Sequence, residues 1–294
     1  MTTRRRFLTI LASATILPAV GIPAGAQTRQ WRGIALGANA QIVLDHPQAD
    51  MLLDKALQEI TRLEGLFSLH RDSQLTRLNA NGTLPDPAPE MLEILSLASA
   101  VNARTKGAFD PSIQPLWALY AESYAAGNTP TEAEIAAIPR GWKNLRFTPE
   151  QVAFARSGMA LTLNGIAQGF IADKVTALLR ANGVRDVLVN TGEIVAAGKA
   201  PDGTPWPVQI GYGGSRTVPL SNKAIATSAP LGTTFDQGGH VGHIIDPRTG
   251  KPAATRERVS VIANSAALAD ALSTAFCLMT DAEIAAAKGD VEVI

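Results

Sequence analysis

Apolar residues recur along the chain at two spacings, and each spacing predicts its own kind of element. A period of three to four residues places Ala56, Ile60, Leu63 and Phe67 on one face of an amphipathic helix over residues 51–67. Further helices are predicted at residues 89–104, after the Thr131-x-x-Glu134 capping box, at 165–182, at 266–279 with Ser265 as its cap, and after Thr280-x-x-Glu283.

Short apolar runs bounded by turn residues predict strands. They are expected as a pair around Gly37 within residues 31–44, and singly at 161–163, 186–190, 206–211, 223–227, 242–245, 258–263 and 291–294. We find no tandem repeat and no low-complexity linker. Because strands and helices do not alternate strictly, the pattern favours an α+β fold over a doubly wound parallel sheet.

The first 26 residues differ from the rest and are expected to be a targeting segment, which leaves residues 27–294 as the mature domain. Three arginines precede an apolar run over residues 7–22, and Ala24-Gly25-Ala26 is a small-residue cleavage signal. The order Thr3-Arg4-Arg5-Arg6-Phe7-Leu8 resembles the twin-arginine export motif, with an ordinary Sec signal as the alternative. We therefore expect a periplasmic protein carried by the twin-arginine export machinery.

The composition is that of a globular protein, with 46% hydrophobic and 18% charged residues. The full chain has a formal net charge of zero, and the mature part keeps 23 basic and 26 acidic residues, a net of −3. No basic block follows the first few residues, so a nucleic-acid partner is not expected. The single cysteine, Cys277, excludes an internal disulfide and lies in an apolar run typical of a core.

Asp270 is the most informative residue, because it is the only charged one in the apolar segment 265–279. Thr274 follows four residues later, so a helix places both side chains on one face. A carboxylate and a hydroxyl are hard oxygen ligands of the kind that Mg²⁺ prefers. A buried carboxylate without a cation is costly. The alternative is an aspartate bonded to a distant lysine or to a backbone group.

Two other segments carry candidate chemistry. His243 ends a predicted strand before the Asp246-Pro247 turn, where it can serve as a general base or bind a phosphate, the alternative being a structural role. Asn164-Gly165 stands at the expected start of a helix, whose free N–H groups suit a phosphate. The glycine-rich run 211–214 lacks a P-loop lysine and a dinucleotide fingerprint, and is interpreted as a loop.

An ordered set of short runs resembles the ApbE family of FAD:protein FMN transferases, over residues 77 to 274. The runs are Arg77-Leu78-Asn79, Gly107-Ala108-Phe109-Asp110-Pro111, Gly165-Ile166-Ala167-Gln168-Gly169-Phe170, Asn190-Thr191-Gly192-Glu193, Ala226-Thr227-Ser228, 243–250 and Ala269-Asp270-Ala271-Leu272-Ser273-Thr274. The resemblance implies an ApbE-like, T-fold-related mixed sheet with flanking helices, in a single compact catalytic unit.

The resemblance also implies roles for individual residues. Asp270 and Thr274, with the backbone carbonyl of Gly165, would hold Mg²⁺, and His243 and Asp270 would be the catalytic residues. The implied contacts to FAD come from Leu36, His70, Ala108, Phe109, Asp110, Thr162, Gln168, His243 and Ile245.

The implied reaction cleaves the pyrophosphate of FAD. A Ser or Thr hydroxyl of an acceptor flavoprotein attacks the FMN phosphorus, and AMP leaves. The acceptor would face the periplasm, and a subunit of a membrane respiratory complex is one candidate. Two alternatives stay open: an FAD pyrophosphatase that uses water and yields FMN and AMP, and a non-catalytic periplasmic flavin-binding protein.

Four positions depart from the family pattern that the resemblance brings. The family usually has Asp at Thr162, a charged residue at Gln168 and Gly at Ala229, and often has Gly at Thr191. The loss of two polar contacts is expected to weaken FAD binding or to change the acceptor, whereas the metal chemistry should survive because its two side chains are present.

Overall fold

The structure is a computed structural model that describes residues 14–16, 28–210, 216–253 and 256–294. Most of the expected targeting segment, including its arginines and its cleavage signal, lies outside the described residues, as does the run 211–214. Within that segment, β1 (Ala14–Ile16) pairs antiparallel with β9 (Trp206–Ile210). In the described part of the chain, no helix has the length and hydropathy of a membrane span.

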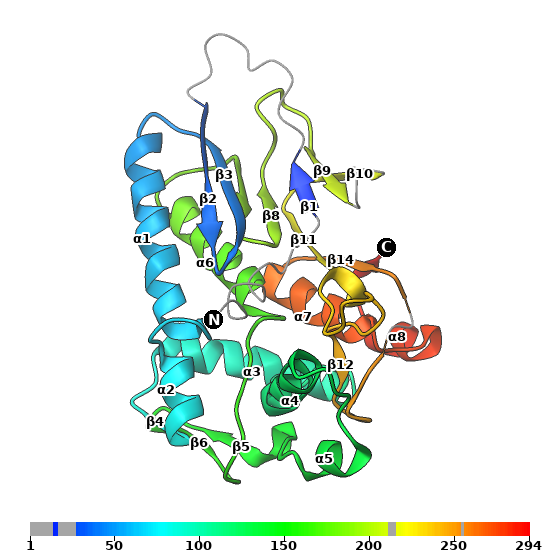
Figure 1. The fold of residues 1–294 in the computed structure, drawn as a ribbon. Helices are drawn as coiled ribbons and strands as arrows, with labels where there is room; N and C mark the ends of the chain where they lie inside the picture. The colour runs from blue at the N-terminus through cyan, green and yellow to red at the C-terminus, as the bar shows by residue number, and fades with distance from the viewer. Residues whose placement is uncertain (1–13, 17–27, 211–215, 254–255) are drawn as a thin grey trace.

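A seven-stranded sheet forms the centre of the molecule (Figure 1), and every neighbouring pair of its strands is antiparallel. Its order is β15 (Glu292–Val293), β14 (Val259–Ala263), β11 (Lys223–Ser228), β8 (Ile194–Ala197), β7 (Val187–Asn190), β3 (Ala38–Asp45) and β2 (Thr28–Ala35). The N-terminal hairpin thus joins strands from the second half of the chain, for example through the pair Gln41 and Asn190.

Helices cover one face of this sheet, and a small second sheet covers part of the other. The first layer holds α1 (Ala49–Phe67), α6 (Ala167–Ala181) and α7 (Ala266–Phe276), and α3 (Pro89–Arg104) packs against α7. Strands β9 and β10 (Arg216–Leu220) form the other layer together with β1. Because both faces of the sheet are covered, successive side chains of β7 are buried on alternate faces. Val187 and Val189 face the helices, whereas Leu188 packs in the cluster of β9 and β10.

Smaller elements complete the lower half of the view in Figure 1. They are α2 (Gln74–Asn81), α4 (Gln114–Ala125), α5 (Glu132–Ala137), α8 (Asp281–Ala287), the sheet of β4 (Thr83–Pro85), β5 (Leu145–Phe147) and β6 (Gln151–Phe154), the hairpin of β12 (Ile245–Asp246) and β13 (Lys251–Pro252), and the 3₁₀ turns Pro111–Ile113, Trp142–Asn144 and Pro230–Gly232. Here Tyr120 and Tyr124 of α4 stack with Phe235.

The α+β class and most predicted elements are confirmed, including the strand pair around Gly37 and the capping boxes of Thr131 and Thr280. The strand predicted at residues 161–163 is wrong. The backbone there is extended, but its hydrogen bonds go elsewhere: N of Leu161 donates to the side chain of Asn79, and N of Thr162 donates to O of Pro111.

The start of the following helix is also corrected. Ile166 has φ −155° and stands outside the helix, so α6 begins at Ala167 and not at Gly165. N of Ala167 donates to O of Leu163, and N of Gly169 donates to a carboxylate of α7. Two of the first three N–H groups of this helix are therefore engaged by the protein, which leaves fewer donors for a phosphate than the sequence predicted.

The crossing of α6 and α7 is the closest helix contact that positions the candidate site. A Cβ at Gly169 would stand 2.3 Å from O of Ala266 in α7. Asp173, one turn further along α6, accepts hydrogen bonds from N of Ala266 (2.8 Å), N of Ala267 (3.0 Å) and Oγ of Ser265 (2.7 Å). An acid from one helix thus caps the N-terminus of the other, where its charge is stabilised by the helix dipole.

We expect Gly169→Ala to lower the free energy of unfolding by roughly 1–3 kcal/mol, because the new methyl group must push α6 off the backbone of α7. Gly65→Ala in α1 is the matched control: nothing lies within 4 Å of its new Cβ, so it should be neutral or stabilise by about 0.5–1 kcal/mol. Urea unfolding measures both. Equal effects of the two variants would contradict the close crossing.

Candidate functional site

Asp270 lies at the centre of the candidate site, on the face of α7 that points into the protein. Asp270 is 3% exposed, and it is the only charged residue in this helix. Among the described residues its carboxylate accepts one hydrogen bond, from N of Gly169 to Oδ2 at 3.2 Å. Burial raises the pKa of Asp270 from 3.8 to about 8, since the charged form loses its water.

Two further carboxylates share this region, and neither was singled out by itself from the sequence. Glu193, which follows β7, is 4% exposed and accepts a hydrogen bond from N of Thr227 at 3.1 Å. Burial and the nearby charge of Asp270 raise the pKa of Glu193 well above its ordinary value. The negative charge of Asp173 also raises the pKa of Asp270. None of the ion pairs between described residues involves these three acids, and the nearby charge of Lys174 acts on Asp173 without forming an ion pair with it.

The other two predicted ligands meet beside this acid. A Cβ at Gly165 would stand 3.0 Å from Oγ1 of Thr274 and 3.5 Å from the ring of Phe109. Thr274 is one helical turn from Asp270 on α7 and half-buried. The three residues therefore bring a carboxylate, a hydroxyl and a backbone segment to one place. This oxygen-rich donor set, next to two further buried carboxyl groups, fits a hard divalent cation such as Mg²⁺.

Within the described residues, no group of three or more His, Cys, Asp and Glu side chains is arranged to hold a metal ion. The ligand set of one carboxylate, one hydroxyl and one carbonyl contains a single residue of these types. An ion held there would leave further coordination positions for water and for phosphate oxygens, as is usual for Mg²⁺.

The segment with Ala108, Phe109 and Asp110 forms one wall of the same region. Ala108 and Phe109 are buried, and Asp110 accepts hydrogen bonds from N of Ser112 (2.8 Å) and N of Trp142 (3.0 Å). Burial raises the pKa of Asp110 despite these donors. Asp110 thus anchors its own loop. Thr162 is tied to this wall through its backbone, and its Oγ1 accepts from N of Asn164.

His243 lies in a loop that is hydrogen-bonded to the residues after β11. Its Nδ1 is 3.0 Å from O of Thr233 and 3.2 Å from O of Pro230. Carbonyl oxygens only accept, so Nδ1 carries a proton, and in the neutral ring Nε2 is left with its lone pair. Burial lowers the pKa of His243, which keeps the ring neutral near pH 7. This is the protonation state of a general base.

Leu36 and His70 lie at one end of α1, where Glu64 connects their two loops. Oε1 of Glu64 accepts from N of Leu36 (2.7 Å), and Oε2 pairs with Arg71 (2.8 Å). Leu36 has a positive φ of 46° in the turn between β2 and β3, and His70 is exposed. The structure therefore brings these two predicted contacts together, at a turn and a loop that solvent can reach.

Gln168 and Ile245 are both buried, in different surroundings. Gln168 covers Gly192, where a Cβ would stand 2.6 Å from its amide carbon, and its backbone O accepts from Oγ1 of Thr191. Ile245 belongs to the cluster around Tyr120 and Phe235. Both side chains thus pack within the protein and are not exposed to solvent.

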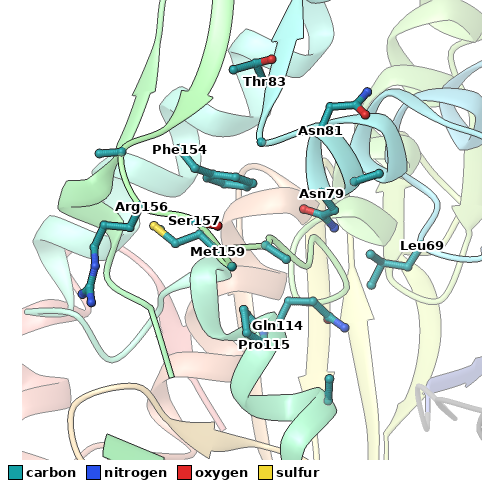
Figure 2. A pocket seen from close by; sticks show the side chains of 16 residues that line it. Leu69, Asn79, Asn81, Thr83, Gln114, Pro115, Phe154, Arg156, Ser157 and Met159 are labelled. Carbon is teal, nitrogen blue, oxygen red and sulfur yellow. The ribbon is translucent and has the colours of Figure 1, made fainter. Parts of the chain in front are cut away.

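A cavity of about 700 Å³ opens beside the predicted contacts without including them. Figure 2 shows Phe154 and Met159 on one side of it and Asn79 with Gln114 on the other. Asn79 links the cavity to the site, because its side chain holds both N and O of Leu161, the residue before Thr162.

Three polar residues that shape the site were not predicted individually from the sequence. Asp173 and Glu193 carry the charges around Asp270, and Ser228 lies 2.7 Å from Oγ of Ser273 and 3.2 Å from Oγ1 of Thr274. A signal existed for Asp173, since it is an acid in an apolar helical segment, as Asp270 is. Glu193 and Ser228 fall inside runs that carried the family resemblance, but only their neighbours in space reveal a role.

Comparison with known proteins identifies relatives along almost the whole chain. Residues 36–294 match the model of the ApbE family. An FAD:protein FMN transferase of Vibrio cholerae is 28% identical over 298 residues, which cover 94% of this chain and 88% of the relative. An FAD:protein FMN transferase of Treponema pallidum is 31% identical, with 75% of this chain and 70% of the relative covered.

Solved structures agree with these sequence relatives. The apo form of the flavinyl transferase ApbE of Pseudomonas stutzeri has a TM-score of 0.80 at 27% identity, with 91% of this chain and 90% of that chain covered. An ApbE protein of Thermotoga maritima has a TM-score of 0.77 at 28% identity, with 86% and 87% covered. The fold and the order of the elements are thus shared over most of both chains.

In the absence of divalent metal, the melting temperature should fall as the pH rises from 5 to 9. A carboxyl whose pKa is raised on folding, to about 8 for Asp270, stabilises the folded state below its unfolded pKa, and this stabilisation is lost as the pH rises through 8. Asp270→Asn should make the fall shallower, because an amide does not ionise, while Glu193 with its raised pKa keeps part of the slope. Added Mg²⁺ should raise the melting temperature more at pH 8 than at pH 5. A variant with the pH slope of the parent would refute the assignment.

Proposed function

The chain belongs to the ApbE family and is an enzyme of the FAD:protein FMN transferase class, and from this premise we propose the finer chemistry of its site. It transfers FMN from FAD to a Ser or Thr hydroxyl of an acceptor protein, releases AMP, and depends on Mg²⁺. The observation that carries the proposal is the buried Asp270, without a lysine or arginine partner among the described residues, one turn from Thr274 and next to Gly165.

Asp270, Thr274 and the carbonyl of Gly165 would hold the ion. A bound Mg²⁺ neutralises phosphate oxygens and stabilises the negative charge that develops on the leaving group. The protein's own contribution is to keep the carboxylate of Asp270 in place through N of Gly169, and to present a hydroxyl and a carbonyl beside it. Burial makes this arrangement costly without a cation, so the ion and the fold support each other.

His243 is proposed to accept the proton of the attacking hydroxyl. A new bond forms between the acceptor oxygen and the FMN phosphorus, the bond from that phosphorus to the bridging oxygen breaks, and AMP leaves with that bond's electron pair. The proton moves from the hydroxyl to Nε2 of His243, whose lone pair is available because Nδ1 faces two carbonyl groups.

The residues proposed to contact FAD come from several loops, from α6 and from β12. They are Leu36, His70, Ala108, Phe109, Asp110, Thr162, Gln168, His243 and Ile245. The contacts of Phe109 with Gly165 and of Thr162 with the loop of Asp110 support one continuous site. Gln168 is packed over Gly192, so a dinucleotide would meet an uncharged, buried amide at that position.

We further propose that residues 1–26 are a twin-arginine signal and that the enzyme works in the periplasm, with residues 27–294 as its catalytic unit. The sequence of Arg4, Arg5, Arg6, Phe7 and Leu8 and the cleavage signal at 24–26 support this. The acceptor would then be a flavoprotein facing the periplasm, such as a subunit of a membrane respiratory complex.

A direct test incubates the protein with FAD, Mg²⁺ and a candidate acceptor carrying a Ser or Thr, and follows AMP release and in-gel flavin fluorescence. We expect a fluorescent acceptor band and one molecule of AMP for each acceptor molecule that receives FMN. EDTA should abolish both. Free FMN without a fluorescent band would instead indicate an FAD pyrophosphatase. Tight FAD binding without AMP would indicate a flavin carrier, an outcome that the uncharged residues at Thr162 and Gln168 would explain.

His243→Ala should lower the rate of FMN transfer by about 10²–10⁴-fold because the proton acceptor is lost, and should lower FAD affinity by a smaller factor because one contact is lost. His46→Ala, which removes an imidazole from the loop between β3 and α1, is the matched control and should transfer at the normal rate. Single-turnover AMP release and flavin-fluorescence titration separate the two quantities. Normal transfer by His243→Ala would remove this residue from the mechanism.

A further inference from the structure

Three hydroxyl groups from two elements meet at the edge of the site. Oγ of Ser228, at the end of β11, is 2.7 Å from Oγ of Ser273 and 3.2 Å from Oγ1 of Thr274, both on α7. Ser273 is fully buried, whereas Ser228 and Thr274 are half-buried. The group therefore runs from the core to the more accessible side of the helix, where Thr274 lies against Gly165.

The direction of these hydrogen bonds is fixed from the buried end. Oγ of Ser273 donates to the backbone O of Asp270 at 2.9 Å, because a carbonyl can only accept. The single proton of Ser273 is then used, so Ser273 accepts the proton of Ser228. With that proton used as well, Ser228 accepts the proton of Thr274. The order of donation is Thr274 to Ser228 to Ser273 to the carbonyl of Asp270.

This order decides what Thr274 presents to a ligand. A hydroxyl that binds a cation does so with an oxygen lone pair, and a proton pointing at the ion would repel it. Because the proton of Thr274 is directed at Ser228, the lone pairs of its oxygen face the other way. The last acceptor of the chain is the backbone of Asp270 itself, so the same hydrogen bonds join the two side chains proposed as ligands.

We propose that Ser228 is a positioning residue for the cation site: it takes the proton of Thr274 and thereby turns the oxygen of Thr274 toward the ion. This inference rests on the proposed function and deepens it. Outer partners that orient metal ligands typically change metal affinity by about 10–100-fold when removed. Ser228 does not touch the ion in this arrangement.

The backbone of Ser228 is itself held in place. The thiol of Cys277 lies 3.6 Å from O of Ser228, and burial raises the pKa of Cys277 to about 12, so the thiol keeps its proton and donates it. Two residues later, O of Pro230 is one of the two carbonyls that fix the tautomer of His243. The short segment 228–230 thus orients both the hydroxyl ligand and the proposed base.

The test measures Mn²⁺, a paramagnetic probe for the Mg²⁺ site, by electron paramagnetic resonance of the full chain with FAD. We expect Ser228→Ala to weaken Mn²⁺ binding at least ten-fold and Ser228→Thr, which restores the hydroxyl, to recover most of it. Ser273→Ala should also weaken binding, because the freed proton of Ser228 can then turn toward Thr274. Ser221→Ala, whose hydroxyl donates to O of Gly198 on the exposed surface, is the control and should leave Mn²⁺ affinity unchanged.

Melting temperatures measured without metal show whether Ser228 positions Thr274 or only stabilises the fold. Ser228→Ala should lose much more affinity than the small change in its metal-free melting temperature accounts for. An affinity within two-fold of the parent, or a loss that Ser228→Thr does not recover, would overturn the proposal. Failure of the proposed function has a different signature, since the parent chain would then transfer no FMN to an acceptor even with Mn²⁺ bound normally.

Discussion

At the crossing of α6 and α7, Gly169 lets two helix backbones approach to a distance that no larger residue allows, and Asp173 closes the contact by capping the start of α7. The position of Asp270 depends on this crossing. One turn into α7, its carboxylate reaches N of Gly169 only because the helices are so close. Local helix geometry alone would place an acid on this face without giving it that partner.

The same crossing explains the charge of the site. Asp173 stabilises the helix end, but its negative charge adds to that of Asp270, and Glu193, in the turn between β7 and β8, brings another buried carboxyl. A protein does not gather such groups in its interior without compensation by protons or cations. Protons compensate at low pH, and near neutrality the proposed divalent ion would do so. The way in which the two helices are joined thus gathers the carboxyl groups that such a cation would stabilise.

Much of this was predictable from the sequence, for reasons that are local. The α1 and α3 helices, the hairpin around Gly37 and the caps at Ser265 and Thr280 follow from periodicity and from capping chemistry. Asp270 and Thr274 could be selected because a charge in an apolar helix is conspicuous. What failed was non-local: residues 161–163 look like a strand, but they pair with the side chain of Asn79 and with Pro111. The roles of Ser228 and Glu193 become apparent only from their proximity to α7, which follows them in the chain.

The order of the strands has a consequence for how the enzyme is made. The central sheet joins the N-terminal hairpin to strands beyond residue 187, and α7 supplies Asp270 later still. Any nascent chain that stops short of α7 lacks Asp270 and the helix N-terminus that Asp173 caps, whatever its other parts have folded into. Ribosomal products cut short before this point therefore lack the central acid of the candidate site, and the complete site arises only late in synthesis.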